Sequence, residues 1–325
     1  MSLDFGDLKK VGRPAVLMSF VPASFEIAGV MLLAPLLFDV SLTEAAVMGS
    51  VLAAVSPAVV VPRMIRIMEE GYGTGKGIPQ LILAGASADD VFVIVLFSAF
   101  LSLATGGDFH AGTLLQVPVS IGFGILMGAG AGSGLVAFFK KFHMRDTVKI
   151  IVILSISGLM MELENVLKGT VPLSGLIAIM SMGLLINQNY KVLAERLSSK
   201  YSKLWVGAEV LLFALVGAAV DLNYAVSAGF TSVVIVLGAF LFRMAGVQVS
   251  LLNTPLSRKE KYFCMMAYTP KATVQAAIGA IPLAMGLASG QIILTVAVAA
   301  ILITAPAGAI AMDHLYPKLL SRDRR

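Results

Sequence analysis

The chain has 325 residues, of which 58% are hydrophobic and 13% are charged, and its mean hydropathy is +0.91. A soluble globular protein is about one quarter charged, so this composition excludes an ordinary soluble domain and indicates a membrane protein. Cys264 is the only cysteine, which excludes a disulfide framework, and His110, His143 and His314 are too scattered for a metal-ligand cluster.

Apolar segments follow one another along the whole chain, and a bilayer crossing needs roughly 20 such residues. We predict ten spans, over residues 14–38, 42–66, 78–104, 111–139, 147–163, 172–188, 203–222, 226–250, 260–284 and 290–312. The fifth and sixth are short. The expected fold class is therefore an all-α polytopic membrane protein with about ten transmembrane helices.

Basic residues alternate between the predicted loops. Of 24 lysines and arginines, 21 lie in every second loop or at the termini, beginning with Lys9, Lys10 and Arg13, whereas the opposite loops hold Lys168 alone. This is the positive-inside pattern, and it predicts a plasma (inner) membrane protein with both termini cytoplasmic. The pattern also explains the pI of about 9.3 without a nucleic-acid partner.

The second and ninth spans each contain a hydroxyl residue followed by proline near the middle, Ser56-Pro57 and Thr269-Pro270. Proline breaks or kinks a helix, and in lipid the freed carbonyls need new partners. Paired interruptions in two halves are typical of transporters with inverted repeats. Spans one to three and eight to ten start seven crossings apart, which predicts an inverted-topology repeat. The alternative is that prolines are simply common in spanning helices.

Asp89 and Asp90 lie side by side in the middle of the third span. Each charged residue there costs about 2.5–3.5 kcal/mol, and adjacent carboxylates also repel each other. Folding does not require such a pair. We therefore interpret it as a site that binds and moves a cation or a proton.

The predicted spans hold five ionisable residues at mid-membrane depth: Glu26, Asp89, Asp90, Arg243 and Lys271. Buried charges must be paired or neutralised, so two ion pairs leave one carboxylate to hold a proton or a cation. We predict that Glu26 pairs with Arg243, that Asp89 faces Lys271, and that Asp90 carries the ion. Lys271 has two alternative roles, as a proton carrier or as a cap for freed carbonyls.

Competition between a proton and a cation for one carboxylate produces antiport if the protein changes access only when loaded. A hard cation would take oxygens from Asp90, Asp89 and the region of Ser56. The sequence therefore predicts exchange of H⁺ for Na⁺ or Li⁺, or for K⁺, with no cofactor. The glycine-rich fourth span, residues 124–134, predicts close helix packing or a flexible connector.

Five motifs occur in the order that characterises one family. They are Ala54-Val-Ser-Pro-Ala-Val-Val-Val-Pro62, Gly71-Tyr-Gly73, Asp89-Asp90, Pro270-Lys-Ala-Thr-Val-Gln-Ala-Ala-Ile-Gly279 and Ile303-Thr-Ala-Pro306. The chain resembles the double-aspartate branch of the cation/proton antiporter superfamily. It is most similar to the sodium/hydrogen exchangers of solute carrier family 9 subfamily B and their bacterial relatives.

The resemblance implies an elevator, in which a six-helix core carries the ion and slides against a dimerising scaffold. It implies that Asp90 binds cation and proton with Asp89 as its partner, and that Glu26 pairs with Arg243. Lys271 matches the lysine of the penultimate span. The resemblance also places two crossed, unwound helices at the Ser56-Pro57 and Thr269-Pro270 breaks.

The domains expected on this basis are residues 1–106 and 226–325 as two halves of the core, and 107–225 as connector and partial scaffold. Family members usually have about three more spans before Pro14, so part of the dimer surface is expected to be missing. The expected partners are a proton, a monovalent cation and membrane lipid, and a second copy of the chain if the full scaffold is present.

Other functions compete with antiport. A cation channel or uniporter could use the same fold, a truncated core could bind cation without transporting it, and an organic-anion symporter is a remoter option. An intramembrane aspartyl protease would need its aspartates on different helices, to flank a peptide bond, whereas Asp89 and Asp90 are consecutive. We therefore expect that the protein is not an enzyme.

Overall fold

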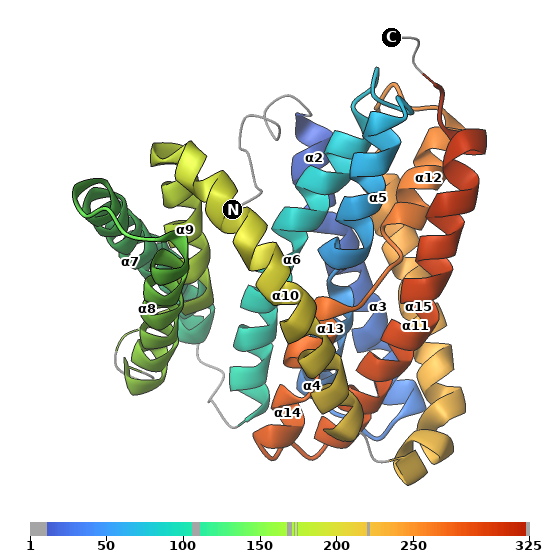
Figure 1. Cartoon of the computed structure of the whole chain (residues 1–325). Coiled ribbons are helices and arrows are strands. Elements are labelled where there is room, and N and C mark those ends of the chain that lie inside the picture. The colour runs from blue at the N-terminus through green and yellow to red at the C-terminus, as the bar shows by residue number, and fades with distance from the viewer. Residues whose placement is uncertain are drawn as a thin grey trace. The chain divides into compact units, whose positions relative to one another are not determined.

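The computed structural model describes residues 12–105, 111–167, 171, 173, 175–219 and 222–322 (Figure 1). Lys9, Lys10 and Lys168 lie outside these ranges. The described residues form helices and one isolated bridge between Tyr72 and Arg322, with no longer strand among them, which confirms the all-α class. The helices are α2 (Arg13–Met18), α3 (Val21–Leu37), α4 (Leu42–Ala53), α5 (Pro57–Glu69), α6 (Ile78–Ala104), α7 (Ala111–Lys141), α8 (Asp146–Leu167), α9 (Gly175–Asn189), α10 (Lys191–Ala219), α11 (Leu222–Ser250), α12 (Arg258–Ala267), α13 (Thr273–Ile278), α14 (Ile281–Ala284) and α15 (Gly290–Leu319).

About ten spans were expected, and fewer helices of the described part of the chain meet the criteria of length and apolarity for a membrane span. Six stretches of the described residues are long and apolar enough to cross a membrane: Arg13–Leu37, Leu42–Glu69, Ile78–Ala104, Gly122–Lys141, Gly229–Ser250 and Gly290–Leu319. The ninth predicted span falls short because its helix is interrupted into α12, α13 and α14. The sixth falls short because α9 has 15 residues.

The chain divides into two compact units, one of residues 108–210 and the other of residues 4–107 and 211–325. The first unit contains α7, α8, α9 and the first part of α10. Glycines bring α7 and α9 close together, because a Cβ atom at Gly128 would lie 2.1 Å from the Ala178 carbonyl oxygen and one at Gly132 would lie 3.0 Å from that of Met182. This confirms the predicted close packing of the glycine-rich span.

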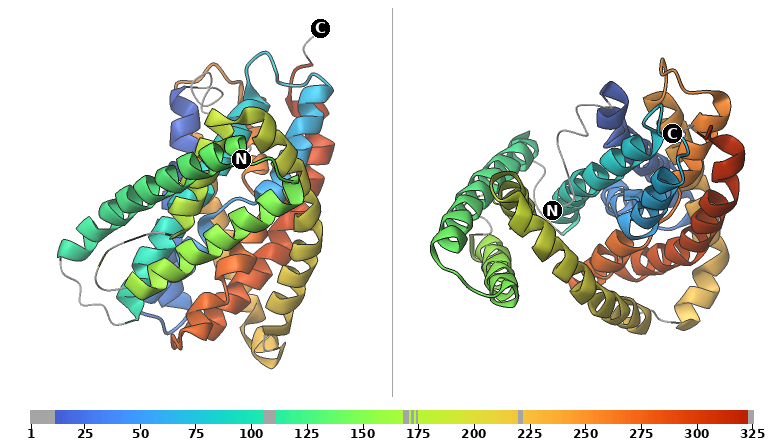
Figure 2. Two further views of the ribbon diagram at one scale, coloured as in Figure 1. Left: turned by 60° about the vertical axis from the view of Figure 1, so that its left-hand side comes forward. Right: turned by 45° about the horizontal axis from the view of Figure 1, so that its top comes forward.

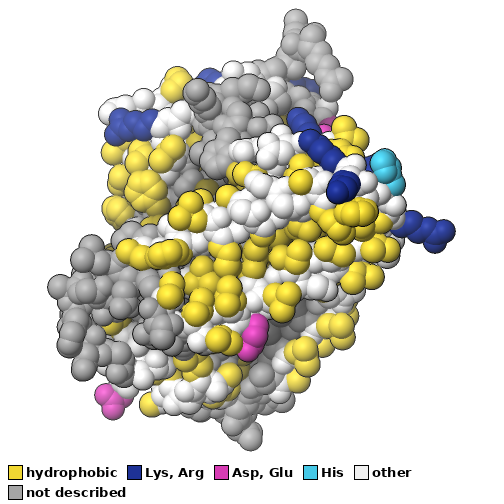
Figure 3. All heavy atoms as spheres, turned by 90° about the vertical axis from the view of Figure 1, so that its left-hand side faces the viewer, with side chains coloured by type: hydrophobic (Ala, Val, Ile, Leu, Met, Phe, Trp, Pro, Cys, Tyr) yellow, Lys and Arg dark blue, Asp and Glu magenta, His cyan; other side chains and the backbone are white. Residues whose placement is uncertain are grey.

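Hydrophobic side chains are widely exposed on this first unit. Figure 3 shows them gathered in a broad band, with basic side chains toward the edges of the view. The exposed apolar residues of α7 and α8 include Leu126, Ile151, Leu154 and Leu159. Apolar surface of this extent is typical of a face that contacts lipid or another protein.

The second unit contains α2–α6 and, after the end of α10, α11–α15. Two halves repeat the same order of elements, because α3, α4–α5 and α6 correspond to α11, α12–α14 and α15. Helices α3 and α11 pack directly on each other. A Cβ atom at Gly29 of α3 would lie 2.4 Å from Phe242 Cγ of α11, and one at Gly246 of α11 would lie 2.7 Å from Pro22 Cα.

One end of this unit gathers the α5–α6 turn, the start of α12 and the end of α15 (Figures 1 and 2). The Gly73 backbone N–H donates a hydrogen bond to the Ser321 carbonyl at 2.8 Å, and Lys76 Nζ lies 2.8 Å from Glu260 Oε2. A backbone hydrogen bond and an ion pair therefore join the two halves of the repeat at this end.

The first segment of each interrupted helix, α4 and α12, begins with a capping box. At the start of α4, the Ser41 and Glu44 side chains form a reciprocal capping box, and Ser257 and Glu260 do so at the start of α12. A capping box satisfies backbone N–H groups that have no intrahelical partner. It fixes where each interrupted helix begins.

Candidate functional site

The two helix breaks meet in the second unit. Helix α4 ends at Ala53 and α5 begins at Pro57, where proline at the first helical position needs no N–H donor. Helix α12 ends at Ala267 and α13 begins at Thr273. The Ser56 N–H donates a hydrogen bond to the Pro270 carbonyl at 2.8 Å, so the two breaks touch through their backbones.

Three carbonyls at the end of α4 lose their helical partners at the break, and polar side chains from the second half of the unit take them up. Lys271 Nζ donates to the Leu52 carbonyl, Arg243 Nη1 to that of Ala53, and Gln275 Nε2 to that of Ala54 at 2.9 Å. In lipid every backbone polar group must be satisfied within the protein, and this arrangement meets that requirement.

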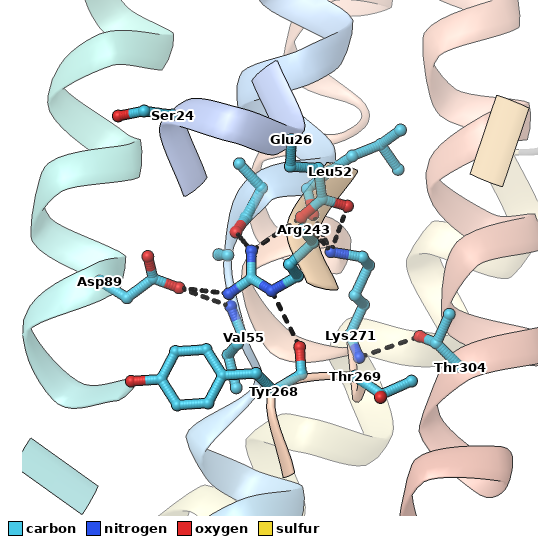
Figure 4. Close-up of polar contacts among 12 residues, drawn as sticks. Ser24, Glu26, Leu52, Val55, Asp89, Arg243, Tyr268, Thr269, Lys271 and Thr304 are labelled. Carbon is cyan, nitrogen blue, oxygen red and sulfur yellow. Dashed lines mark hydrogen bonds and ion pairs between the residues drawn. The ribbon is translucent and has the colours of Figure 1, made fainter. Parts of the chain in front are cut away.

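Arg243 lies at the centre of the site and is fully buried. Its guanidinium donates to Glu26 Oε2 at 2.7 Å and to Asp89 Oδ2 at 2.9 Å, and its Nε donates to the Tyr268 carbonyl at 2.8 Å (Figure 4). The planar fork of an arginine can serve several acceptors at once, which a lysine cannot do with fixed geometry. Arg243 therefore joins α3, α6 and the α12 break.

The predicted ion pair between Glu26 and Arg243 is confirmed, whereas the predicted contact of Asp89 with Lys271 is wrong. Lys271 Nζ lies 2.7 Å from Glu26 Oε1. The break places Lys271 beside the Leu52 carbonyl, and Glu26 of α3 is the carboxylate within its reach there. Asp89 instead accepts from Arg243 and, at 3.0 Å, from the Val55 N–H.

Asp90 stands outside this network. Glu26, Asp89, Arg243 and Lys271 form one connected set of two negative and two positive charges. Among the described residues no ion pair includes Asp90. Three oxygens, Asp90 Oδ1, Asp89 Oδ1 and Ser56 Oγ, are buried without a hydrogen-bond partner in the described part of the chain. Unpartnered oxygens of this kind suit a hard cation or a proton.

The remaining predicted residues flank the breaks. Thr269 Oγ1 donates to the Met265 carbonyl at 3.4 Å, and Pro57 and Pro270 border the two unwound segments. Gln275 and Thr304 were missed as site residues, although both lie in motifs quoted for the family resemblance. Thr304 Oγ1 accepts the Lys271 backbone N–H at 3.0 Å. An uncharged polar residue a few positions from a proline in a predicted span was the signal available.

Residues 1–312 match the family model described as "Sodium/hydrogen exchanger, transmembrane". The chain belongs to this family. Sodium/hydrogen exchanger 9B2 of Homo sapiens is 32% identical over 336 residues, which cover 99% of this chain and 62% of that protein. Sodium/hydrogen exchanger 9B1 of Macaca fascicularis is 34% identical over 294 residues, which cover 85% of this chain and 55% of that protein. These matches confirm the resemblance seen in the motifs.

A solved structure has the same fold. The sodium proton antiporter MjNhaP1 from Methanocaldococcus jannaschii at pH 8 matches with a TM-score of 0.81 and 18% identity, covering 98% of this chain and 81% of that one. The relatives are named as exchangers and antiporters, which are transporters and not enzymes. The chain spans less than two thirds of the length of the curated relatives described above.

Proposed function

We propose that the chain is a secondary cation:proton antiporter that exchanges H⁺ for Na⁺ or Li⁺, or for K⁺, at Asp90. The observation that carries this proposal is the exclusion of Asp90 from the ion-pair network. The other four mid-helix charges balance one another. Asp90 is therefore the carboxylate whose charge has to be neutralised by an ion that can come and go.

The exchange follows from the cost of moving a bare carboxylate. With a proton, Asp90 is neutral; with a monovalent cation held by Asp90, Asp89 Oδ1 and Ser56 Oγ, the net charge of the site is the same. An unloaded Asp90 would carry a bare charge through the apolar part of the protein, which is costly. The site therefore changes sides when loaded with either ion, and the two ions compete for it.

The ion-pair network keeps the site in shape during this cycle. Arg243 and Lys271 hold the carbonyls of the α4 break whether or not Asp90 is charged. Their own charges are balanced by Glu26 and Asp89. The loaded and unloaded states therefore differ at Asp90, and the breaks need not re-form their hydrogen bonds.

The orientation and assembly belong to the same proposal. The α5–α6 turn and the start of α12 meet at one end of the second unit (Figure 1). Arg66 lies in the last turn of α5, Lys76 in the α5–α6 turn, and Arg258 at the start of α12. In a plasma (inner) membrane the positive-inside rule assigns this end to the cytoplasm. Residues 1–106 and 226–325 would move as an elevator against residues 107–225, in a homodimer.

The test is collapse of a pH gradient in proteoliposomes on addition of Na⁺, Li⁺ or K⁺. Wild type is compared with Asp90→Asn and with Asp146→Asn, whose aspartate pairs with Arg196 in the other unit. We expect a signal from wild type and Asp146→Asn and none from Asp90→Asn. Cation flux without proton movement would indicate a channel. Thermal stabilisation by cation without transport would indicate a binding core that does not cycle.

A further inference from the structure

Tyr268 is a buried side chain for which the proposed exchange gives no role. It is the C-cap residue that follows α12 at the break, and its side chain is fully buried. Arg243 holds it twice, through the hydrogen bond to its carbonyl and with the guanidinium carbon 5.5 Å from the ring centroid. Its hydroxyl is buried without a hydrogen-bond partner among the described residues. The ring is therefore fixed while its polar end is left unsatisfied.

The Tyr268 hydroxyl is directed at the helix that carries the aspartate pair (Figure 4). A Cβ atom at Gly85 of α6 would lie 2.0 Å from this oxygen. Gly85 precedes Asp89 by four residues, which is about one helical turn. The hydroxyl thus reaches α6 about one turn before the aspartate pair, and it can do so because residue 85 has no side chain.

We infer that the Tyr268 hydroxyl is a further oxygen of the ion site, contributed at the turn of α6 that precedes Asp89, and that it favours the metal cation over the proton. This inference rests on the proposed function. A phenol hydroxyl is both donor and acceptor. Its lone pairs can face a cation held by the aspartates, and its proton can turn to a free carboxylate oxygen when the cation leaves. A protonated carboxyl gains less from it, because its charge is already neutralised.

The experiment is cation-dependent exchange by the full chain in proteoliposomes, with Na⁺ as the probe, for wild type and Tyr268→Phe. We expect the half-saturating Na⁺ concentration to rise about three- to tenfold, the worth of one hydrogen-bonding group, with the maximal rate kept. At fixed Na⁺ the acid limb of the pH profile should move to higher pH, because weaker cation binding loses to the proton at lower proton concentration. Tyr201→Phe, which removes a tyrosine hydroxyl in the other unit, should leave both values unchanged.

Gly85→Ala provides an independent route to the same site, because its methyl group would displace the hydroxyl. It should raise the half-saturating Na⁺ concentration in wild type and add little in the Tyr268→Phe background, a coupling that a double-mutant cycle detects. If Tyr268→Phe does not fold, Gly85→Ala alone decides. An unchanged half-saturating concentration, or a lower maximal rate alone, overturns the inference. Absence of Na⁺-dependent exchange in wild type overturns the proposed function instead.

Discussion

Ser56 and Pro270, 214 positions apart in the sequence, are joined by a 2.8 Å backbone hydrogen bond that links the two helix breaks. Each break is completed by the other half of the repeat, since Lys271, Arg243 and Gln275 satisfy the carbonyls at the end of α4. Neither unwound segment could stay buried alone. The two halves of the second unit therefore depend on each other for folding as well as for the ion site.

Replacement of Arg243 by lysine should destabilise the protein strongly. Lysine keeps the positive charge but cannot serve Glu26, Asp89 and the Tyr268 carbonyl together. Loss of one partner from a buried ion pair costs about 3–5 kcal/mol. Thermal unfolding in detergent measures the change, with Arg196→Lys at the exposed pair with Asp146 as the control. Equal melting temperatures for the two variants would contradict a central role of Arg243.

Glu26 and Lys271 should show strong coupling in a double-mutant cycle. Glu26→Gln leaves one positive charge uncompensated in the network, and Lys271→Gln leaves one negative charge. The double variant is neutral again, so it should be less destabilised than the two single effects together, by about 0.5–3 kcal/mol. Unfolding free energies of the four proteins give this number. Strict additivity would mean that the 2.7 Å ion pair has no energetic role.

The sequence predicted which residues form the site better than it predicted which residue each of them pairs with. Charge at mid-span and proline after a hydroxyl residue are local signals, so Asp89, Asp90, Ser56 and Lys271 could be singled out. The choice of partner depends on where the breaks place each side chain in space. For this reason Lys271 was assigned to Asp89, although it pairs with Glu26.

The fold shows the same division between local and long-range information. The all-α class and the two broken helices followed from hydropathy and proline. The number of long apolar helices could not be predicted in this way, because the segment that forms the short helices α12 and α13 looks like a single span in the sequence. The capping boxes at Ser41 and Ser257 were a usable local signal that was missed, since each has glutamate three residues later.

Two glycines of α7 should respond differently to alanine. At Gly128 a Cβ atom would meet the Ala178 carbonyl oxygen at 2.1 Å, whereas at Gly130 no atom lies within 4 Å. Gly128→Ala should force α7 and α9 apart and destabilise by about 1–3 kcal/mol. Gly130→Ala should be neutral or stabilising by up to about 1 kcal/mol, because alanine favours the helix. Melting temperatures of both variants check this, and a neutral Gly128→Ala would contradict the close packing.

The hydrogen bond between Tyr316 and Glu70 should stabilise the folded protein at neutral pH, and this contribution should be lost at acid pH. The Tyr316 hydroxyl donates to the Glu70 carboxylate, and with Arg66 it holds the pKa of Glu70 below its ordinary value of 4.5. A lowered pKa contributes stability that is fully present above 4.5 and is lost as the pH falls through the folded-state value. Tyr316→Phe should therefore melt at a lower temperature than wild type by a constant amount from pH 8 to about 5, and the difference should shrink at lower pH. The Tyr316 ring packs edge-on against Tyr72, with the centroids 5.1 Å apart, and phenylalanine keeps this contact. A difference in melting temperature that persists unchanged down to pH 3 would mean that ring packing, not the hydrogen bond to Glu70, is what the substitution disturbs.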